Sequence, residues 1–283
     1  METVFTNHKF TIEIEKESDI TNIWFFGDVH AGCAGHDEDR FDYFLKRAFQ
    51  SDKEDTYFVG MGDYFDFAST SEQGHLKAGK IHETTMALFD EVVEKGVRKM
   101  VKKLIPMKDK VIGFIEGNHA WTYQNGNTAT KDMAERLNAK ELGWLSHVTL
   151  EFYIKNRDKS QIVTMILCHG KAGGKLMGNS LNQVEDLKRI FPAADIYVMG
   201  HDHQRFAVPS SIILPLFKNG KIYLKQKRQY SCRSGSFLKA YTENKSEYVV
   251  GRLLKPSDLG AIKLEIRFHR DDNMLITDIS AVI

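Results

Sequence analysis

Residues 196–203 read IYVMGHDH, four apolar residues followed by a glycine and by two histidines with one aspartate between them. An uninterrupted apolar run that stops at glycine is typical of a strand that is buried on both faces and ends in a loop. The stretch therefore predicts a strand that presents the imidazoles of His201 and His203 at its carboxyl end. Taken alone, such a pair fits a solvated strand end as well as it fits a metal site.

Four other apolar runs end in the same way. They cover residues 23–26, 57–61, 111–115 and 162–167, and the metal-capable side chains that follow them are Asp28 and His30, Asp63, Asn118 and His119, and His169. A turn or cap role would explain any one of these residues. Because open α/β sheets bind ligands at the carboxyl ends of their strands, we interpret the five groups as one site along one rim of a sheet.

The remaining sequence predicts the layers around that rim. Apolar residues recur every three or four positions over residues 41–49, 86–104, 128–139 and 181–190, which predicts helices there. Alternation of apolar and polar residues predicts half-buried strands over residues 10–15 and 148–154. The polar, glycine-containing stretch 68–80 predicts a surface loop near the mouth of the site.

Beyond His203 the pattern changes to strand after strand. Strands are predicted over residues 207–217, 221–224, 230–239, 248–254, 262–268 and 274–279, with Asn219-Gly220 as a hairpin turn. No Pro- or Ser-rich linker separates the two halves of the sequence. We therefore expect an α/β fold of two packed mixed β-sheets flanked by helices, as a single domain over residues 1–283.

Composition places the chain among globular proteins. A hydrophobic content of 42% and a charged content of 27% argue against a disordered or membrane-embedded chain. The net charge of +1 provides no overall attraction to nucleic acid or to anionic lipid. Three cysteines without paired spacing, no signal peptide and no apolar stretch of membrane-spanning length predict a cytoplasmic protein without a membrane partner, of open oligomeric state.

The candidate ligands are carboxylates, imidazoles and one amide oxygen. This mixture suits manganese, iron or zinc better than it suits a thiolate zinc site or an all-oxygen calcium site. The candidates exceed the needs of one ion, so we expect two ions, about 3.5–4 Å apart, that hold phosphoryl oxygens and activate a bridging water. Asp63 is the predicted bridge, because the two oxygens of a carboxylate can each bind a different metal.

These five blocks, in this order, resemble the signature of the calcineurin-like metallophosphoesterase superfamily. The signature D-x-H, G-D-x-x-D, G-N-H, H and G-H-x-H matches Asp28-Val29-His30, Gly62–Asp66, Gly117-Asn118-His119, His169 and Gly200–His203. The resemblance covers most of the chain and implies a four-layer αββα fold. It also implies hydrolysis of a phosphate ester by a hydroxide that bridges two divalent metals, with manganese expected and iron, zinc, nickel or cobalt as alternatives.

Carried over residue by residue, the resemblance implies a role for each position. One metal would be held by Asp28, His30, Asp63 and His203, and the other by Asp63, Asn118, His169 and His201. His119 would assist the leaving group, as a proton donor or by binding a phosphate oxygen, and Asp66 would lie behind the ligands. Many members carry an acidic residue after G-N-H, whereas Ala120 stands here, which leaves the partner of His119 open.

Basic residues outside the blocks are candidates for substrate contact. Lys171 and Lys175 flank a glycine pair after His169, and a basic cluster at the Asn219-Gly220 hairpin consists of Lys218, Lys221, Lys225, Lys227, Arg228 and Arg233. A plain flexible loop explains Lys171 and Lys175 equally well, and a solvated basic face is the default explanation of the basic cluster. The basic cluster, and a Gly-Asp-Tyr-Phe-Asp block that looks like the one in repair nucleases of the superfamily, favour a phosphodiesterase or nuclease acting on nucleic acid.

Two other functions stay open at this point. The same motifs serve phosphomonoesterases and protein or nucleotide phosphatases, because specificity lies in the surrounding loops. A non-catalytic interaction scaffold on the same fold is the third alternative, and it is less consistent with a chain in which every metal position is filled.

Overall fold

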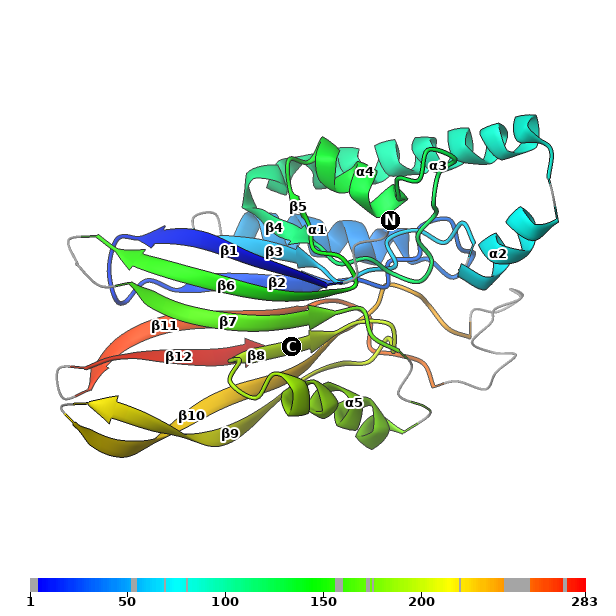
Figure 1. Ribbon diagram of the computed structural model, residues 1–283. Helices are drawn as coiled ribbons and strands as arrows, with labels where there is room; N and C mark the ends of the chain where they lie inside the picture. The colour runs from blue at the N-terminus through cyan, green and yellow to red at the C-terminus, as the bar shows by residue number, and fades with distance from the viewer. Residues whose placement is uncertain are drawn as a thin grey trace.

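Two six-stranded mixed sheets pack face to face at the centre of the fold (Figure 1). Sheet A has the strand order β1-β6-β7-β8-β10-β9, and sheet B has the order β12-β11-β2-β3-β4-β5. The computed structural model describes residues 5–51, 55–68, 70–79, 81–155, 160–171, 174, 176–218, 220–241, 255–271 and 274–283. The predicted α/β arrangement of two packed mixed sheets is confirmed.

Each sheet contains a run of parallel strands. In sheet A, β7 (Gln161–Cys168), β8 (Ile196–Met199) and β10 (Lys221–Ser234) are parallel, whereas the edge strand β9 (Arg205–Lys218) returns antiparallel to β10. In sheet B the parallel strands are β2 (Thr21–Phe26), β3 (Thr56–Gly60), β4 (Val111–Phe114) and β5 (Lys140–Glu141). The sheets are completed by β1 (Phe5–Ile14), β6 (Leu145–Ile154), β11 (Ile262–Asp271) and β12 (Met274–Val282).

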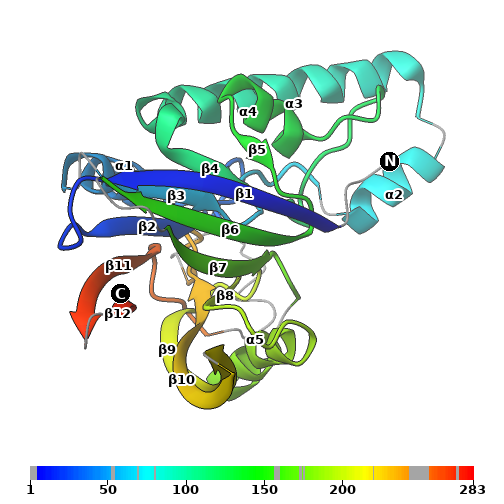
Figure 2. The same cartoon turned by 60° about the vertical axis from the view of Figure 1, so that its left-hand side comes forward.

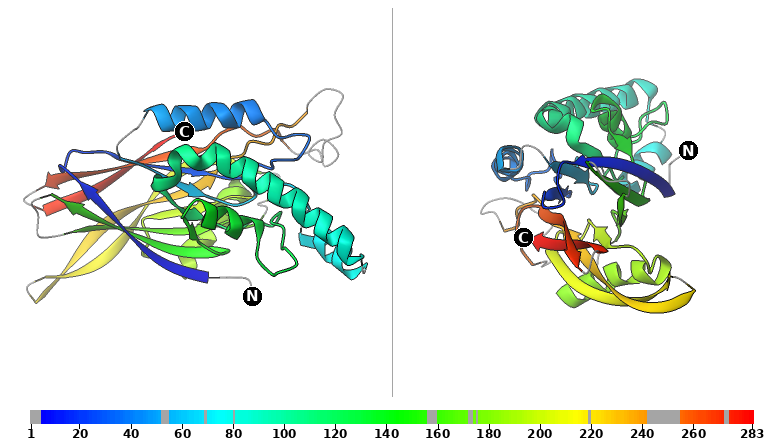
Figure 3. Two further views of the ribbon diagram at one scale, coloured as in Figure 1. Left: turned by 90° about the horizontal axis from the view of Figure 1, so that it is seen from above. Right: turned by 90° about the vertical axis from the view of Figure 1, so that its left-hand side faces the viewer.

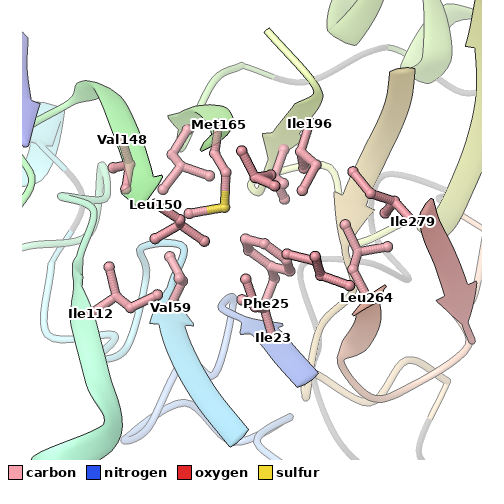
Figure 4. Close-up of a cluster of buried hydrophobic side chains, with 14 of the residues drawn as sticks. Ile23, Phe25, Val59, Ile112, Val148, Leu150, Met165, Ile196, Leu264 and Ile279 are labelled. Carbon is pink, nitrogen blue, oxygen red and sulfur yellow. The ribbon is translucent and has the colours of Figure 1, made fainter. Parts of the chain in front are cut away.

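Strand β2 shows why its sequence is continuously apolar. Ile23 and Phe25 point into the core between the two sheets, where Figure 4 shows side chains from both sheets in contact. Trp24 and Phe26 belong to a second core on the opposite face of sheet B, beneath the helices. A strand that is covered on both faces needs apolar residues at every position, which the run 23–26 supplies.

Helices cover the outer face of each sheet, which makes four layers (Figures 2 and 3). Helices α1 (Glu38–Ser51), α3 (Glu83–Leu104) and α4 (Ala129–Arg136) pack on sheet B, and α5 (Met177–Ile190) packs on sheet A. Helix α3 buries residues 93, 97, 100 and 104, at the predicted spacing, and a 3-10 turn (Ile105–Lys110) follows it. None of the described helices combines the length and the apolarity needed to cross a membrane.

The segment 68–80 contains helix α2 (Thr70–Ala78), so the predicted surface loop is wrong. The side-chain amide of the buried Gln73 donates to the carbonyl oxygens of Ala68 and Ala120. Its oxygen accepts from the backbone N–H of Thr122, at 3.1 Å. Most of these partners are distant in sequence, so a local pattern with two glycines did not indicate the helix.

Strand β10 is continuous, where the sequence predicts two strands over 221–224 and 230–239. The polar residues 225–229 suggested a break, but each of them pairs in register with a residue of β9. The strand ends at Ser234 because Gly235 takes a φ of 84°, in the left-handed region, where a Cβ would lie 2.2 Å from the Gly260 carbonyl oxygen. The short strand β5 was not predicted, and the predicted strand 248–254 lies outside the described residues.

Candidate metal centre

Five strand ends converge on one edge of the sandwich, the edge toward which β7 and β8 run in Figure 1. Strands β2, β3 and β4 of sheet B deliver Asp28 and His30, Asp63, and Asn118 and His119, and strands β7 and β8 of sheet A deliver His169, and His201 and His203. The site therefore lies at an edge shared by both sheets, and not at the rim of one sheet as predicted. The backbone N–H of His201 donates to both carboxylate oxygens of Asp28, at 3.1 and 2.9 Å, and so joins the two sheets at this edge.

Left-handed backbone conformations occur at most of the candidate ligands. The φ angles are 47° at Asp28, 51° at His30, 50° at Asp63, 68° at His201 and 57° at His203. Such conformations cost a non-glycine residue on the order of 1 kcal/mol or more, and they persist only where the surrounding structure enforces them. Their concentration at the ends of three strands indicates a functional site.

Glycines of the same blocks allow the loops to approach closely. A Cβ at Gly117 would lie 2.2 Å from both the backbone nitrogen and Oδ1 of Asp63. A Cβ at Gly62 would lie 2.4 Å from Nδ1 of His169, and one at Gly200 would lie 2.7 Å from the carbonyl oxygen of Met61. Any larger residue at these positions would therefore push the candidate ligands apart.

The first cluster consists of Asp63, Asn118, His169 and His201. Nδ1 of His169 donates to the carbonyl oxygen of Met61 at 2.8 Å, which directs Nε2 of the same ring into the cluster. That Nε2 lies 3.0 Å from Oδ2 of Asp63, 3.0 Å from Oδ1 of Asn118 and 3.2 Å from Nδ1 of His201. Four donor atoms from four different loops thus surround one point.

The second cluster consists of Asp28, His30 and His203. The Nε2 atoms of the two imidazoles lie 3.2 Å apart, and Oδ1 of Asp28 lies 3.5 Å from Nε2 of His203 and 3.9 Å from Nε2 of His30. Oδ2 of Asp63 is also 3.9 Å from Nε2 of His30. The Asp63 carboxylate therefore lies between the two clusters, within reach of both.

The protonation states of the two clusters suit divalent cations. Burial lowers the pKa of His203 well below its usual value, and burial together with the nearby His169 lowers the pKa of His201 to about 4, so both rings are neutral near pH 7. Burial opposes ionisation of Asp63, but the charge of His169 and its hydrogen bond hold the pKa of Asp63 well below the usual range. Neutral imidazoles and an ionised carboxylate are the ligand forms that metals bind.

The pKa values of Asp28 and His169 show which positive charge a metal cation would replace. Burial raises the pKa of Asp28 to about 6, and although burial opposes charge on His169, the Asp63 carboxylate raises the pKa of that imidazole to about 9. A proton on Nε2 of His169 therefore balances the buried carboxylates when no metal is present. A divalent cation between the same atoms would supply that positive charge, so the residues of both clusters fit a pair of metal ions.

His119 has an acidic partner that its own block lacks. Nδ1 of His119 lies 2.8 Å from Oδ1 of Asp66, and the backbone N–H of His119 donates to Oδ1 of Asp63 at 3.0 Å. Burial works against the charged imidazole, but the hydrogen bond to Asp66 raises the pKa of His119 above its usual value. The acidic group missing at Ala120 is thus supplied by Asp66, and Nε2 of His119 stays available for a substrate oxygen.

Arg233 is a supporting residue that sequence reasoning placed in the wrong group. The sequence places it in the basic cluster, but its side chain is fully buried behind the loop that follows β8. Nη1 donates to the carbonyl oxygen of Gly200 at 2.5 Å, and Nη2 donates to Ser180 and Gln183 of α5 at 3.2 and 2.9 Å. Arg233 therefore positions the Gly200–His203 loop, and no feature of its sequence neighbourhood indicated this.

Ser236 and its neighbour Phe237 support Asp28, a role that the sequence did not reveal. The hydroxyl of Ser236 and the backbone N–H of Phe237 both donate to the carbonyl oxygen of Asp28, each at 3.0 Å. The Ser236 hydroxyl also accepts from the N–H of Leu238 at 3.0 Å. The segment after β10 thus holds the left-handed turn at Asp28 in place.

The candidate substrate contacts are not brought to the centre as a group. Lys171 is exposed two residues after His169, and Lys175 lies outside the described residues. Lys225, Lys227 and Arg228 precede the part of β10 that pairs with β8, so they extend away from the centre. At about 3.3 Å per residue, Arg228 lies roughly 16 Å along the strand from Arg233.

Comparison with known proteins agrees with this geometry. A family model described as calcineurin-like phosphoesterase matches residues 21–205, a span that contains both clusters, His119 and Asp66. No curated protein matches the chain at a significant level.

Solved structures with similar folds have low sequence identity. Vps29 (vacuolar protein sorting 29) from Cryptosporidium parvum is 13% identical, with a TM-score of 0.36, and the match covers 93% of this chain and 98% of that one. A double mutant of Vps29 from Entamoeba histolytica is 11% identical, with a TM-score of 0.36 and coverages of 93% and 100%. GAP50 of Plasmodium is 12% identical, with a TM-score of 0.33 and coverages of 92% and 84%.

Proposed function

The chain belongs to the calcineurin-like phosphoesterase family, and from this premise we propose that it hydrolyses phosphate esters with two divalent cations, manganese first, bound at the metal centre. In this proposal Asp28, His30, Asp63 and His203 hold one cation, and Asp63, Asn118, His169 and His201 hold the other. The observation that carries the proposal is the position of Asp63, whose Oδ2 lies 3.0 Å from His169 of one cluster and 3.9 Å from His30 of the other.

In this proposal the residues of the chain have different roles in the reaction. Two divalent cations at such a centre polarise phosphoryl oxygens and lower the pKa of water. His119 faces the substrate with Nε2, and because Asp66 favours its protonated form, it binds or protonates the oxygen that leaves phosphorus. Met61, Arg233 and Ser236 hold the ligand loops in the geometry that the cations need.

Phosphodiesters, including nucleic acid, are the first substrates to test and phosphomonoesters the second. The Gly62–Asp66 block supports the diester assignment. The hairpin lysines no longer support it, because β10 carries them away from the centre. A single domain and a cytoplasmic location, in keeping with three cysteines that form no disulfide in the described part of the chain, remain part of the proposal.

Substitution of the shared carboxylate tests the proposal. In the presence of Mn²⁺, the protein should hydrolyse bis-p-nitrophenyl phosphate or p-nitrophenyl phosphate, and Asp63→Asn should lower kcat/KM by more than about 100-fold, because it removes a ligand common to both cations. Asp186→Asn, on the exposed face of α5, is the matched control and should leave the rate unchanged. Titration calorimetry with Mn²⁺ should show two sites in the Asp186→Asn protein.

Either of two results would contradict the proposal. Undiminished turnover in Asp63→Asn would show that the centre does not perform the reaction. A protein that binds no divalent cation and hydrolyses neither ester would instead favour the non-catalytic scaffold.

A further inference from the structure

The β9–β10 ribbon extends beyond the body of sheet A. Within β10, only Tyr230–Arg233 pair with β8, so β9 is the only described strand that pairs with residues 221–229. Figure 1 shows this ribbon at the lower left, at the end of the molecule away from the carboxyl ends of β7 and β8. The far end of the ribbon, residues 213–218 and 220–225, is called the hairpin tip below.

Both faces of the hairpin tip expose large apolar side chains. Residues directly opposite each other in an antiparallel ribbon share a face. On one face Phe217 pairs with Ile222, and their side chains are 78% and 63% exposed. On the other face Leu216 pairs with Tyr223, at 47% and 51% exposed. Leu224, on the first face, is 75% exposed.

All charged residues of the hairpin tip are lysines. Residues 205–234 contain no aspartate or glutamate. The side chains of Lys221 and Lys225 are exposed, and neither makes a hydrogen bond or an ion pair with a described residue. Farther along β10, Lys227 pairs with Asp195 at 2.9 Å and Arg228 with Asp278 at 3.7 Å, so cations near the body of the protein have acidic partners.

We propose that the hairpin tip inserts into the interfacial layer of an anionic lipid bilayer. A bilayer surrounds an inserted ribbon and covers both of its apolar faces, whereas a flat protein surface would cover one. Lys221, beside the turn, and Lys225 share one face of the ribbon, and their long side chains extend to the anionic headgroups, where each basic residue contributes to the attraction. A second copy of the chain is a poorer occupant, because it would bring two cationic tips together.

This anchor differs from a membrane-spanning segment. The prediction of no membrane partner rested on the lack of an apolar stretch of spanning length. A hairpin that enters only the interfacial layer needs a few large apolar side chains and neighbouring lysines, and β-strand alternation spreads these over the sequence. The inference does not rest on phosphoesterase activity.

Vesicle binding of the full-length protein tests the proposal. The protein should sediment with vesicles of phosphatidylcholine and phosphatidylglycerol, and weakly with phosphatidylcholine alone. A Phe217→Ser/Leu224→Ser variant should bind the anionic vesicles at least tenfold more weakly, because it removes two inserted side chains. Lys221→Gln/Lys225→Gln should weaken binding by about tenfold or more, and added salt should reduce the difference between the two vesicle types.

Matched controls separate insertion from general effects. Ile190→Ser removes an apolar side chain of α5 that is 68% exposed, and Lys131→Gln removes an exposed cation of α4; both should bind as the unchanged protein does. Circular dichroism and melting temperature should show that the exposed substitutions leave the fold intact. A tryptophan introduced by Phe217→Trp should shift its fluorescence to the blue only with anionic vesicles.

Three results would overturn the proposal. They are absence of binding to anionic vesicles, unchanged binding by the Phe217→Ser/Leu224→Ser variant, and unchanged fluorescence of the introduced tryptophan. A concentration-dependent dimer that the same double substitution abolishes, together with no vesicle binding, would assign the hairpin tip to a second copy of the chain. None of these readouts depends on turnover, so they are independent of the test on Asp63.

Discussion

Glu116 is a buried acid that lies next to the metal centre without belonging to it. Its Oε2 accepts a hydrogen bond from the hydroxyl of Thr128 at 2.6 Å, while its Oε1 is buried without a partner among the described residues. Burial raises the pKa of Glu116 to about 7. The folded protein therefore holds this proton over a pH range in which the unfolded chain releases it.

The raised pKa of Glu116 predicts a pH-dependent gain in stability for Glu116→Gln. The Glu116 carboxyl ionises above about pH 4.5 in the unfolded chain but only near pH 7 in the folded protein. The native protein therefore loses stability as pH rises through this window. Gln removes that loss, which amounts to on the order of 3 kcal/mol above pH 7. Urea unfolding in EDTA should show the variant more stable than the native protein at pH 8 and similar to it at pH 4.5.

Glu135→Gln on the exposed face of α4 is the control and should change stability equally little at both pH values. A constant difference between the Glu116→Gln and native proteins at the two pH values would contradict the assigned pKa.

Among individual residues, the sequence predicted the candidate ligands but not the groups that hold them in position. Asp28, Asp63 and His169 follow apolar runs, so strand periodicity and residue type place them at strand ends. The partner of His119 was left open because Asp66 reaches it through space from a different strand end. The local sequence predicts an exposed Arg233, because the residue follows several lysines in a basic stretch. Its burial becomes visible only in the tertiary structure.

Edge strand β9 carries two prolines whose positions follow from the register. Tyr230, opposite Pro209, donates its N–H to Asp195 on the β8 side, so the residue pair 209 and 230 exchanges no hydrogen bonds across the ribbon. The backbone of Pro209 therefore faces the free edge of sheet A, and so does that of Pro215, six residues along the strand. Each proline removes an outward donor without breaking the ladder to β10.

Restoring those donors should promote association through the edge. A Pro209→Thr/Pro215→Thr variant provides two more outward N–H groups on a long strand, and such edges pair readily with other strands. We expect more dimer or larger species in light scattering at equal concentration. Ser211→Thr, which changes no backbone donor, should behave as the native protein does; equal behaviour of all three proteins would contradict this role of the prolines.

Elements with a strong period were predicted well, and elements made by distant contacts were not. Helix α3 was predicted from its 3- and 4-residue spacing and was found nearly as expected. Helix α2 has a glycine in its interior and a weak pattern, and its buried Gln73 bonds to the segment around residues 120–122. Strand β10 was divided because residues 225–229 are polar, although backbone pairing with β9 does not depend on side-chain polarity.

For the molecule as a whole, metal binding should couple to stability. The two clusters join sheets A and B at one edge, so a cation that binds the folded protein and not the unfolded chain stabilises both sheets. At 100 times its dissociation constant, one bound ion contributes about 2.7 kcal/mol. Mn²⁺ should therefore raise the melting temperature of EDTA-treated protein.

Ca²⁺ is the matched control, because it prefers an all-oxygen site and should give a smaller shift. Asp63→Asn should also reduce the shift with Mn²⁺. Equal shifts with both ions, or in both proteins, would show that the stabilisation does not come from the centre.

The overall layers were predictable because each reflects a local pattern repeated many times. Continuous apolar runs predicted buried strands, and the change after His203 to strand after strand, without a linker, predicted two packed sheets. In the structure β9 and β10 complete sheet A, and β11 and β12 complete sheet B. The order of strands was not predictable, since β1 pairs with β6 and β2 with β11 across more than a hundred residues. For the same reason the sequence predicts the candidate metal site at the rim of one sheet, whereas the structure places it at an edge shared by both sheets.

The left-handed conformations at five of the candidate ligands have an evolutionary consequence. Replacing such a residue by glycine relieves backbone strain. A lineage released from selection for chemistry would then find that losing the ligands makes the protein more stable. Genetic drift would then remove the metal ligands while the four-layer fold persisted. Such a fold would remain stable without catalysis and could acquire a different function.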